Sequence, residues 1–206
     1  MNIALIDFDG TITKKDTLFD FVIFAVGYKT FIIKFILLVP LLILYKLKII
    51  PNWYAKEKLL AAYFKGWELK HFDAIACKYA NERIPLILRG EAIKAIDKHK
   101  ANGDNIVVVT ASCQNWVKPW CIEHKIDCIA TRLEIKNGKL TGRFDGKNCY
   151  GKEKVNRIKE KYNLSNYKKI YAYGDSKGDR EMLELADVQF YKWHNISISK
   201  VYNGQN

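Results

Sequence analysis

The residues best suited to chemistry stand near the N-terminus, where the stretch DFDGTIT carries two aspartates, Asp7 and Asp9. They follow the apolar residues 2–6 and precede Gly10. Side chains two positions apart in an extended segment point the same way, so one carboxylate can attack a substrate while the other transfers a proton. Aspartate before glycine is also common in structural turns. Taken alone, the pair indicates either a catalytic site or a turn.

Polar side chains also stand at the ends of two later apolar runs. Thr110 and Ser112 stand at the end of NIVVVTAS. Asp175 and Asp179 follow the apolar part of KIYAYGDSKGD and are four residues apart, which places them on one side of a turn into a helix. The chain therefore repeats one pattern three times, an apolar run followed by groups that bind metals or anions.

Carboxylates gathered from separate strands would repel one another and raise each other's pKa. A divalent cation removes this conflict, and Mg²⁺ favours few carboxylates together with water and phosphate oxygens. The start of the helix after Ser112 offers unpaired N–H groups for an anion. A lysine in YGKEKV, Lys152 or Lys154, could neutralise phosphate charge. These residues predict both a metal and an anionic, phosphorylated substrate.

The elements that must position these residues alternate between strand and helix. Short apolar runs separated by helix-like sequence predict an α/β fold whose parallel sheet is covered on both faces. Ligands bind such sheets at the carboxyl ends of the strands, which is where the polar residues fall. The predicted strands are residues 2–6, 105–112, 126–131 and the apolar part of 169–179.

A long helical segment interrupts this alternation. Residues 14–103 place apolar residues three and four positions apart with lysines between them, and they contain no comparable strand. The last helix of the segment, near residues 91–100, is assigned to the core. We therefore predict a discontinuous core and an inserted helical cap; the core comprises residues 1–13 and 90–206, and the cap residues 14–89.

One further element has a clear local signal. Asn137 and Gly138 stand between two alternating segments, which is typical of a two-residue β-hairpin turn and predicts a hairpin over residues 133–144. The polar tail beyond Tyr191 shows no pattern that predicts an element.

Composition limits the class of protein and its partners. The chain has 206 residues, 49% of them hydrophobic, and a formal net charge of +12, which favours anionic ligands. The basic residues are not interleaved with aromatic platforms, so no nucleic acid is expected. The five cysteines form no CxxC pair, and no leader pattern precedes the first strand. We expect a reduced, cytoplasmic protein.

Four stretches occur in an order and spacing that resemble a known set of motifs: DFDGT, VVVTAS, the lysine of GKEKV, and YGDSKGD. They resemble the motifs of the haloacid dehalogenase superfamily, in particular its phosphoserine-phosphatase-like branch, which has a helical cap inserted after the first strand. The resemblance covers nearly the whole chain. It implies a Rossmann-like parallel sheet and a Mg²⁺-dependent phosphatase that forms an aspartyl-phosphate intermediate.

The resemblance also implies a role for each motif residue. Asp7 would be the nucleophile, and Asp9 would protonate the leaving oxygen and then activate water. Mg²⁺ would be bound by Asp7, the main-chain carbonyl of Asp9, and Asp175. The phosphoryl oxygens would be bound by Thr110 or Ser112 and by Lys154 or Lys152. The supporting residues would be Asp179, Gly10, Ser176 and Asp16.

Two positions depart from phosphoserine phosphatases. Asp16 stands where those enzymes have a glutamate that binds the substrate amine, and Gly10 stands where they usually have serine. These departures weaken phosphoserine as the predicted substrate.

The stretch FIIKFILLVPLLILYKLKII, residues 31–50, is unusually apolar for a helix on a small domain. Its charge-free part, residues 35–45, spans roughly 16 Å as a helix, about half of a hydrocarbon core. It is interpreted as a buried cap helix, a monotopic helix or hairpin that enters one leaflet, or a membrane span. The lysines that flank this stretch could contact anionic head groups. They are Lys29, Lys34, Lys46, Lys48, Lys56 and Lys58.

The apolar cap and the DSKxD motif are similar to those of phosphatidylglycerophosphatase-type members of the branch. The leading hypothesis for the substrate is therefore a phospholipid head group such as phosphatidylglycerophosphate, with peripheral contact between the cap and the inner face of the membrane. One alternative is a small soluble metabolite such as phosphoserine. Another is a catalytically inactive membrane-binding module, although such a module has no need of all four motifs.

Overall fold

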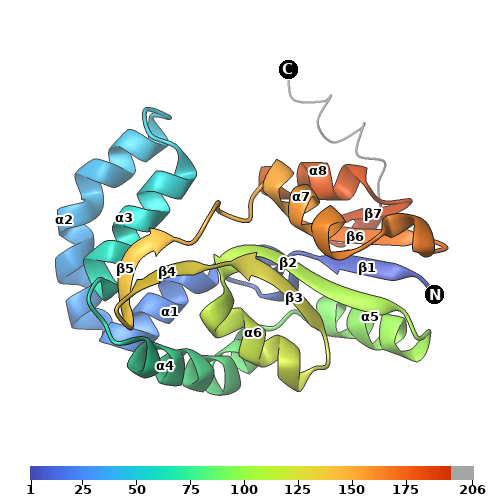
Figure 1. The fold of residues 1–206 in the computed structure, drawn as a ribbon, viewed down its shortest axis with the longest axis horizontal. Coiled ribbons are helices and arrows are strands. Elements are labelled where there is room, and N and C mark those ends of the chain that lie inside the picture. The colour runs from blue at the N-terminus through green and yellow to red at the C-terminus, as the bar shows by residue number, and fades with distance from the viewer. Residues whose placement is uncertain (196–206) are drawn as a thin grey trace.

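The computed structural model describes residues 1–195 and contains a six-stranded sheet in the order β3-β2-β1-β6-β7-β8 (Figure 1). Neighbouring strands are parallel except at the edge, where β8 is antiparallel to β7. The predicted α/β fold with a parallel sheet is confirmed. The strands of this sheet are β1 (Ile3–Ile6), β2 (Asn105–Cys113), β3 (Asp127–Thr131), β6 (Ile170–Gly174), β7 (Val188–Tyr191) and β8 (His194–Asn195).

Helices cover both faces of the sheet, as the apolar strands require. Every residue of β1 is fully buried. Ile3 and Leu5 face one hydrophobic cluster, and Ala4 and Ile6 face the other, because successive strand residues point to opposite faces. Figure 1 shows α5 (Gly90–Ala101) and α6 (Gln114–Glu123) on one side of the sheet, and α7 (Lys152–Lys161) and α8 (Arg180–Glu184) on the other.

Helices also fill the long segment between β1 and α5. They are α1 (Thr17–Val26), α2 (Tyr28–Lys46), α3 (Asn52–Phe64), α4 (Leu69–Glu82) and the short 3₁₀ helix η2 (Ile84–Ile87). The ring of Phe21 in α1 stacks on Trp116 of α6 with 4.5 Å between ring centroids. Phe21 also packs edge-on against Phe72 and Tyr79 of α4. This aromatic cluster joins the inserted helices to the helix that follows β2.

The hairpin predicted at Asn137-Gly138 is present. Strands β4 (Leu133–Lys136) and β5 (Lys139–Phe144) are antiparallel, and both turn residues have positive φ, 51° and 74°. The hairpin forms a separate two-stranded sheet that packs on α3. At Gly142 an added Cβ would lie 2.4 Å from the Cα of Ala61, so only glycine allows the hairpin and the helix to approach this closely.

The apolar stretch is a single helix, α2, that is mostly exposed. Phe31 is its one buried residue. By length and composition alone, α2 is long and apolar enough to cross a membrane. Of its most apolar 18-residue segment, 6% is buried inside the protein. The interpretation of the stretch as a buried cap helix is therefore wrong. The reason is that α2 packs along one side on α1 and α3 and no element covers the other side in the described part of the chain.

Candidate active site

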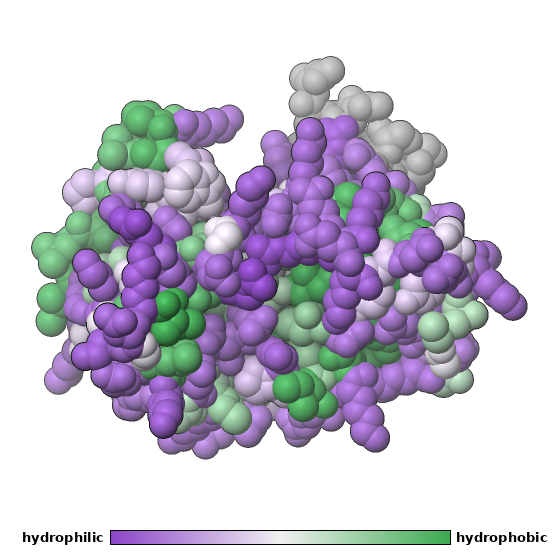
Figure 2. Space-filling model, viewed as in Figure 1, coloured by the Kyte–Doolittle hydropathy of each residue, from purple (hydrophilic) through white to green (hydrophobic). Residues whose placement is uncertain are grey.

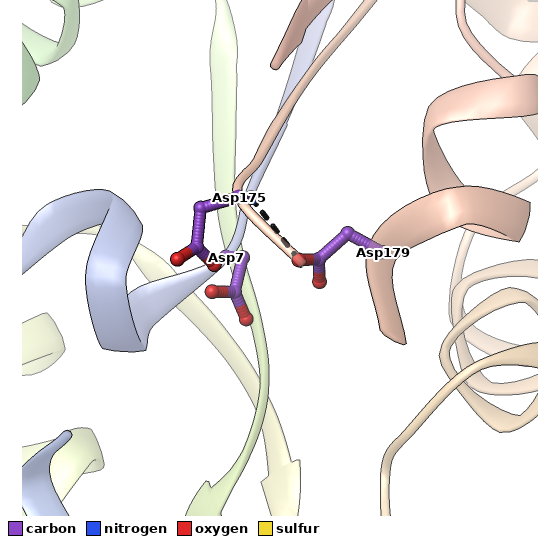
Figure 3. Close-up of side chains that lie close together, drawn as sticks. All are labelled: Asp7, Asp175 and Asp179. Atoms are coloured by element: carbon purple, nitrogen blue, oxygen red, sulfur yellow. Dashed lines mark hydrogen bonds between the residues drawn. The ribbon is translucent and has the colours of Figure 1, made fainter. Parts of the chain in front are cut away.

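Three carboxylates meet where β1 and β6 end, as Figure 3 shows. Asp7 follows β1 directly, and its backbone N–H donates to the Tyr173 carbonyl of β6, which holds the two strand ends together. Asp175 follows β6, and Asp179 directly precedes α8. One oxygen from each of the three side chains lies within 4.8 Å of the others. The strand-end convergence expected from the sequence is therefore present in the fold.

Among residues 1–195, Lys154 is the cation that forms ion pairs with this cluster. Its side chain is buried, and its Nζ donates to Asp7 Oδ1 at 2.6 Å, Asp179 Oδ1 at 2.6 Å and the Val109 carbonyl at 2.7 Å. Burial lowers the pKa of Lys154, but the charges of Asp179 and Asp7 outweigh that effect and raise it above its ordinary value. Lys152, the other lysine considered, is exposed and does not line the cavity described below.

Asp179 is held by more hydrogen bonds than its two neighbours. Its Oδ2 accepts from the backbone N–H of Asp175 at 3.2 Å and from both the N–H and the hydroxyl of Ser176, at 3.0 and 2.8 Å. Because its Oδ1 accepts from Lys154, both oxygens are engaged. This arrangement positions Lys154 and shapes the loop that carries Asp175.

Asp175 differs from Asp179 in the hydrogen bonding of its carboxylate. Among the described residues, nothing donates a hydrogen bond to its carboxylate, and the side chain is half-buried beside Gly10. A Cβ at residue 10 would lie 2.1 Å from Asp175 Oδ2, and φ of Gly10 is +77°. Gly10 is therefore required both for its backbone conformation and for the space that Asp175 occupies.

Asp9 is fixed by hydroxyl and amide donors. Its Oδ1 accepts from the N–H and hydroxyl of Thr17, at 2.7 and 2.6 Å, and its Oδ2 accepts from the Ser112 hydroxyl. The Trp116 indole N–H donates to the Thr17 hydroxyl at 3.1 Å. Ser112 is completely buried, and in this arrangement its hydroxyl serves Asp9. Thr110, the other hydroxyl considered for the phosphoryl group, does line the cavity.

A cavity of about 310 Å³ opens over these residues. Its lining contains the predicted site residues Asp7, Asp9, Thr110, Lys154 and Asp16. Further lining residues come from other segments and include Lys14, Lys15, Asn52, Lys56 and Tyr150. Asp16 accepts a hydrogen bond from the Leu18 N–H and so caps α1 while its side chain faces the cavity.

The electrostatics of the cluster fit a hard cation. Burial, followed by the nearby Asp179 carboxylate, raises the pKa of Asp7 well above its usual range against the opposing effect of Lys154. The same two causes raise the pKa of Asp175 to about 6. Lys154 already bonds two of the three carboxylates and does not reach Asp175. An oxygen site with an unpartnered carboxylate and excess negative charge suits Mg²⁺.

Several residues of the site were not predicted from the sequence, and four of them illustrate what was missed. Thr17 holds Asp9, and Lys56 lines the cavity and donates to the Ala111 carbonyl at 2.9 Å. Tyr150 forms part of the wall. Arg89 donates from Nε to the Gly10 carbonyl at 2.9 Å and so supports the loop after Asp9. Only Thr17 has a local signal, as a hydroxyl residue directly after the helix-capping Asp16.

Comparison with known proteins agrees with this geometry. The family model of haloacid dehalogenase-like hydrolases matches residues 4–184. The chain belongs to this family. The match confirms the resemblance indicated by the four motifs and covers every strand end that contributes to the cavity of this hydrolase.

Two curated proteins are similar to this hydrolase in sequence. CicA of Caulobacter vibrioides is 34% identical over 190 residues, which cover 90% of this chain and 83% of CicA. A probable phosphatase of Mycobacterium tuberculosis is 32% identical over 124 residues, 58% of this chain and 42% of that protein.

Two solved structures share the fold. The first is a protein of unknown function from Bordetella pertussis, with a TM-score of 0.77, 22% identity, and coverage of 92% of this chain and 89% of that one. The second is a phospho-aspartyl intermediate analogue of phosphoserine phosphatase, with a TM-score of 0.61, 22% identity, and coverage of 92% and 85%. At these identities the likeness shows a common fold.

Proposed function

We propose that this hydrolase is a Mg²⁺-dependent phosphatase that cleaves phosphomonoesters through an aspartyl-phosphate on Asp7. The observation that carries the proposal is the environment of Asp7. One of its oxygens, Oδ1, is held by Lys154, while Oδ2 accepts no hydrogen bond from the described residues and belongs to a side chain that lines the cavity. A fixed carboxylate with one unengaged oxygen is suited to nucleophilic attack.

Each residue around the cavity has its own role in the proposed reaction. Asp7 attacks phosphorus, so a bond forms between a carboxylate oxygen and phosphorus while the bond from phosphorus to the ester oxygen breaks. Asp9, held by Thr17 and Ser112, donates a proton to the departing oxygen and later accepts one from the water that hydrolyses the acyl phosphate. Lys154 and Thr110 contact the phosphoryl oxygens.

Asp7 and Asp175, with the Asp9 main-chain carbonyl, would hold Mg²⁺. When bound, the ion screens the repulsion between the Asp7 carboxylate and the substrate phosphate. Asp179 remains a positioning residue in this scheme because both its oxygens already accept hydrogen bonds.

The test of this chemistry compares the wild-type protein with Asp7→Asn and Asp9→Asn. The wild type should hydrolyse p-nitrophenyl phosphate with Mg²⁺ and lose activity in EDTA. Asp7→Asn should lose turnover and the covalent phosphoenzyme detected by intact mass spectrometry. Asp9→Asn should still become phosphorylated by an ester with a good leaving group. Turnover by Asp7→Asn near the wild-type rate, with asparagine confirmed at residue 7, would refute the assignment.

We further propose an amphiphilic substrate, a phosphorylated lipid head group such as phosphatidylglycerophosphate. Support comes from a second cavity of about 630 Å³ that shares Asn52 and Tyr150 with the catalytic cavity. Its lining includes the apolar side chains of Pro51, Trp53 and Phe144. A leaving group longer than a small metabolite can extend from Asp7 into this groove, where its apolar part meets aromatic surface.

A substrate panel tests this choice. Phosphatidylglycerophosphate in detergent micelles should have a higher kcat/KM than phosphoserine or simple sugar phosphates. Trp53→Ala should raise KM for the lipid and leave p-nitrophenyl phosphate unaffected, because Trp53 lines the second cavity and does not line the catalytic cavity. A preference for phosphoserine would assign the enzyme to soluble metabolites instead.

A further inference from the structure

Helix α2 presents two apolar faces, and the protein covers only one of them. On the inner face, Phe31 stacks on Tyr63 of α3 with 5.9 Å between centroids, and the Tyr63 hydroxyl donates to the Phe31 carbonyl at 2.7 Å. Phe35 packs against Phe31 and Phe19 on the same side. These contacts fix the orientation of α2 on the inserted helices and leave the opposite face pointing outward.

The outer face carries a continuous apolar stripe. Its members recur at intervals of three and four residues, which places them along one side of the helix. They are Ile33, Ile36, Leu37, Pro40, Ile43, Leu44 and, just past the helix, Leu47. All are exposed, with 65% of Ile33 and 76% of Leu37 accessible. Figure 2 shows hydrophobic residues in green along the α2 edge and at the tip of the α2–α3 hairpin.

The charge around this stripe has one sign. No acidic residue occurs between Asp20 and Glu57. Those two are themselves engaged, since Asp20 accepts from Arg83 at 2.9 Å and Glu57 accepts from the Phe144 N–H at 2.7 Å. Exposed lysines stand at both ends of the stripe; they are Lys29, Lys46 and Lys48. The surface therefore combines apolar side chains with uncompensated positive charge.

We propose that the outer face of α2 docks on the surface of an anionic lipid bilayer, with the stripe in the interface and the lysines against the head groups. A helix with apolar residues in the interface and basic residues at the rim is bound by both effects. The stripe is roughly 21 Å long at the helical rise of 1.5 Å per residue. It lies in the membrane plane and does not cross the bilayer, because the inner face stays packed on α3.

Docking would place the catalytic cavity beside the head groups. The loop after α2 leads directly into α3, whose residues Asn52 and Lys56 line that cavity. The Asn52 side chain donates to the Tyr45 hydroxyl at the end of α2 at 3.0 Å, which ties the stripe to the cavity rim. The docking surface does not depend on the proposed chemistry, although together they explain how a lipid-linked phosphate reaches Asp7.

The test is co-sedimentation of the full chain with two kinds of vesicle, phosphatidylcholine alone and phosphatidylcholine mixed with phosphatidylglycerol. The wild type should bind the anionic vesicles at low salt and lose binding as salt rises. The double variant Ile33→Ser, Leu37→Ser should bind about tenfold or more weakly. Lys46→Gln with Lys48→Gln should weaken binding by about fivefold per lysine.

Matched control variants separate this surface from general effects. Ile122→Ser with Leu86→Ser changes the same residue types at 65% and 70% exposure, on α6 and η2. Lys94→Gln with Lys98→Gln removes two exposed charges from α5, at the far end of the molecule in Figure 1. Both controls should bind like the wild type, and so should Asp7→Asn, which distinguishes docking from catalysis.

Three outcomes would overturn the proposal. The first is a wild-type protein that stays in the supernatant with anionic vesicles at low salt. The second is resistance to carbonate extraction after expression in cells, which would indicate a spanning helix. The third is a stable dimer in light scattering that the stripe variant dissociates while vesicle binding is absent, which would assign the stripe to a second copy of the chain.

Discussion

Replacing Gly10 by alanine should disable the proposed metal site and lower the free energy of unfolding by about 1–2 kcal/mol. The added Cβ would lie 2.1 Å from Asp175 Oδ2, whereas ordinary contact begins at 3.4 Å. The carboxylate must therefore move by about 1.3 Å. Displacements of about 1 Å at a catalytic group can cost roughly a hundredfold in rate. We expect kcat/KM to fall by about that factor and the Mg²⁺ concentration for half-maximal activity to rise.

The backbone cost of the substitution can be measured separately. Gly10 and Gly146 both have positive φ, +77° and +83°, but a Cβ at Gly146 meets nothing within 4 Å. Gly146→Ala should therefore incur only the left-handed penalty of about 1–2 kcal/mol in the free energy of unfolding. Its Mg²⁺ dependence should match that of the wild type.

The assays are urea unfolding for stability and Mg²⁺ titration of p-nitrophenyl phosphate hydrolysis for activity. The two variants should lose similar stability and differ in kcat/KM and in Mg²⁺ dependence. If Gly10→Ala keeps the wild-type Mg²⁺ requirement and rate, the carboxylate of Asp175 does not bind the metal in the way we propose.

Three further predictions follow from other contacts of the described residues. Asp175→Ala should raise the Mg²⁺ concentration needed for activity, because a site with few carboxylates loses one ligand; unchanged hydrolysis in EDTA would contradict this. Ser112→Ala should lower kcat by about 10- to 100-fold and alter the pH–rate profile, because it removes a charge-assisted hydrogen bond to Asp9, worth about 1.5–3 kcal/mol; an unchanged profile would count against Asp9 as the acid. Burial opposes ionisation of Asp104, but hydrogen bonds from His99 and Asn2 hold its pKa below the usual range. Its contribution to stability is therefore present above the unfolded-state pKa and lost as pH falls through the folded-state pKa. Asp104→Asn should be less stable than the wild type at neutral pH, with a difference that narrows in acid, measured by urea unfolding across the acidic range.

The sequence by itself determined the elements whose signals are local. The buried apolar run of residues 3–6, the strand at β2 and the Asn137-Gly138 turn each follow from neighbouring residues, because strand burial and hairpin geometry depend on short-range pattern. The parallel sheet follows from the alternation of these elements. Its topology then brings Asp7 and Asp175 together, because β1 and β6 are neighbours whose ends lie at one edge.

Tertiary structure decided the assignments that depend on which side chains meet. Lys152 and Lys154 are the same residue type, two positions apart at the start of α7. Only the Lys154 side chain points toward Asp7 and Asp179 and donates to both. Thr110 and Ser112 both lie near the C-terminal end of β2, yet of these two only the Ser112 hydroxyl donates to Asp9. In each pair the two residues are only two positions apart, so the sequence does not tell which side chain reaches the site. That depends on where the fold places Asp7 and Asp9, more than a hundred residues away in the chain.

The exposure of α2 was also beyond the reach of the sequence. An apolar helix has the same composition whether it is enclosed by other helices or packed along one side. In the fold, α1 and α3 contact α2, and its outer stripe remains uncovered by the described residues. Burial is a property of the whole arrangement of helices, so the same apolar residues that predicted a helix could not tell which of its faces would meet the protein.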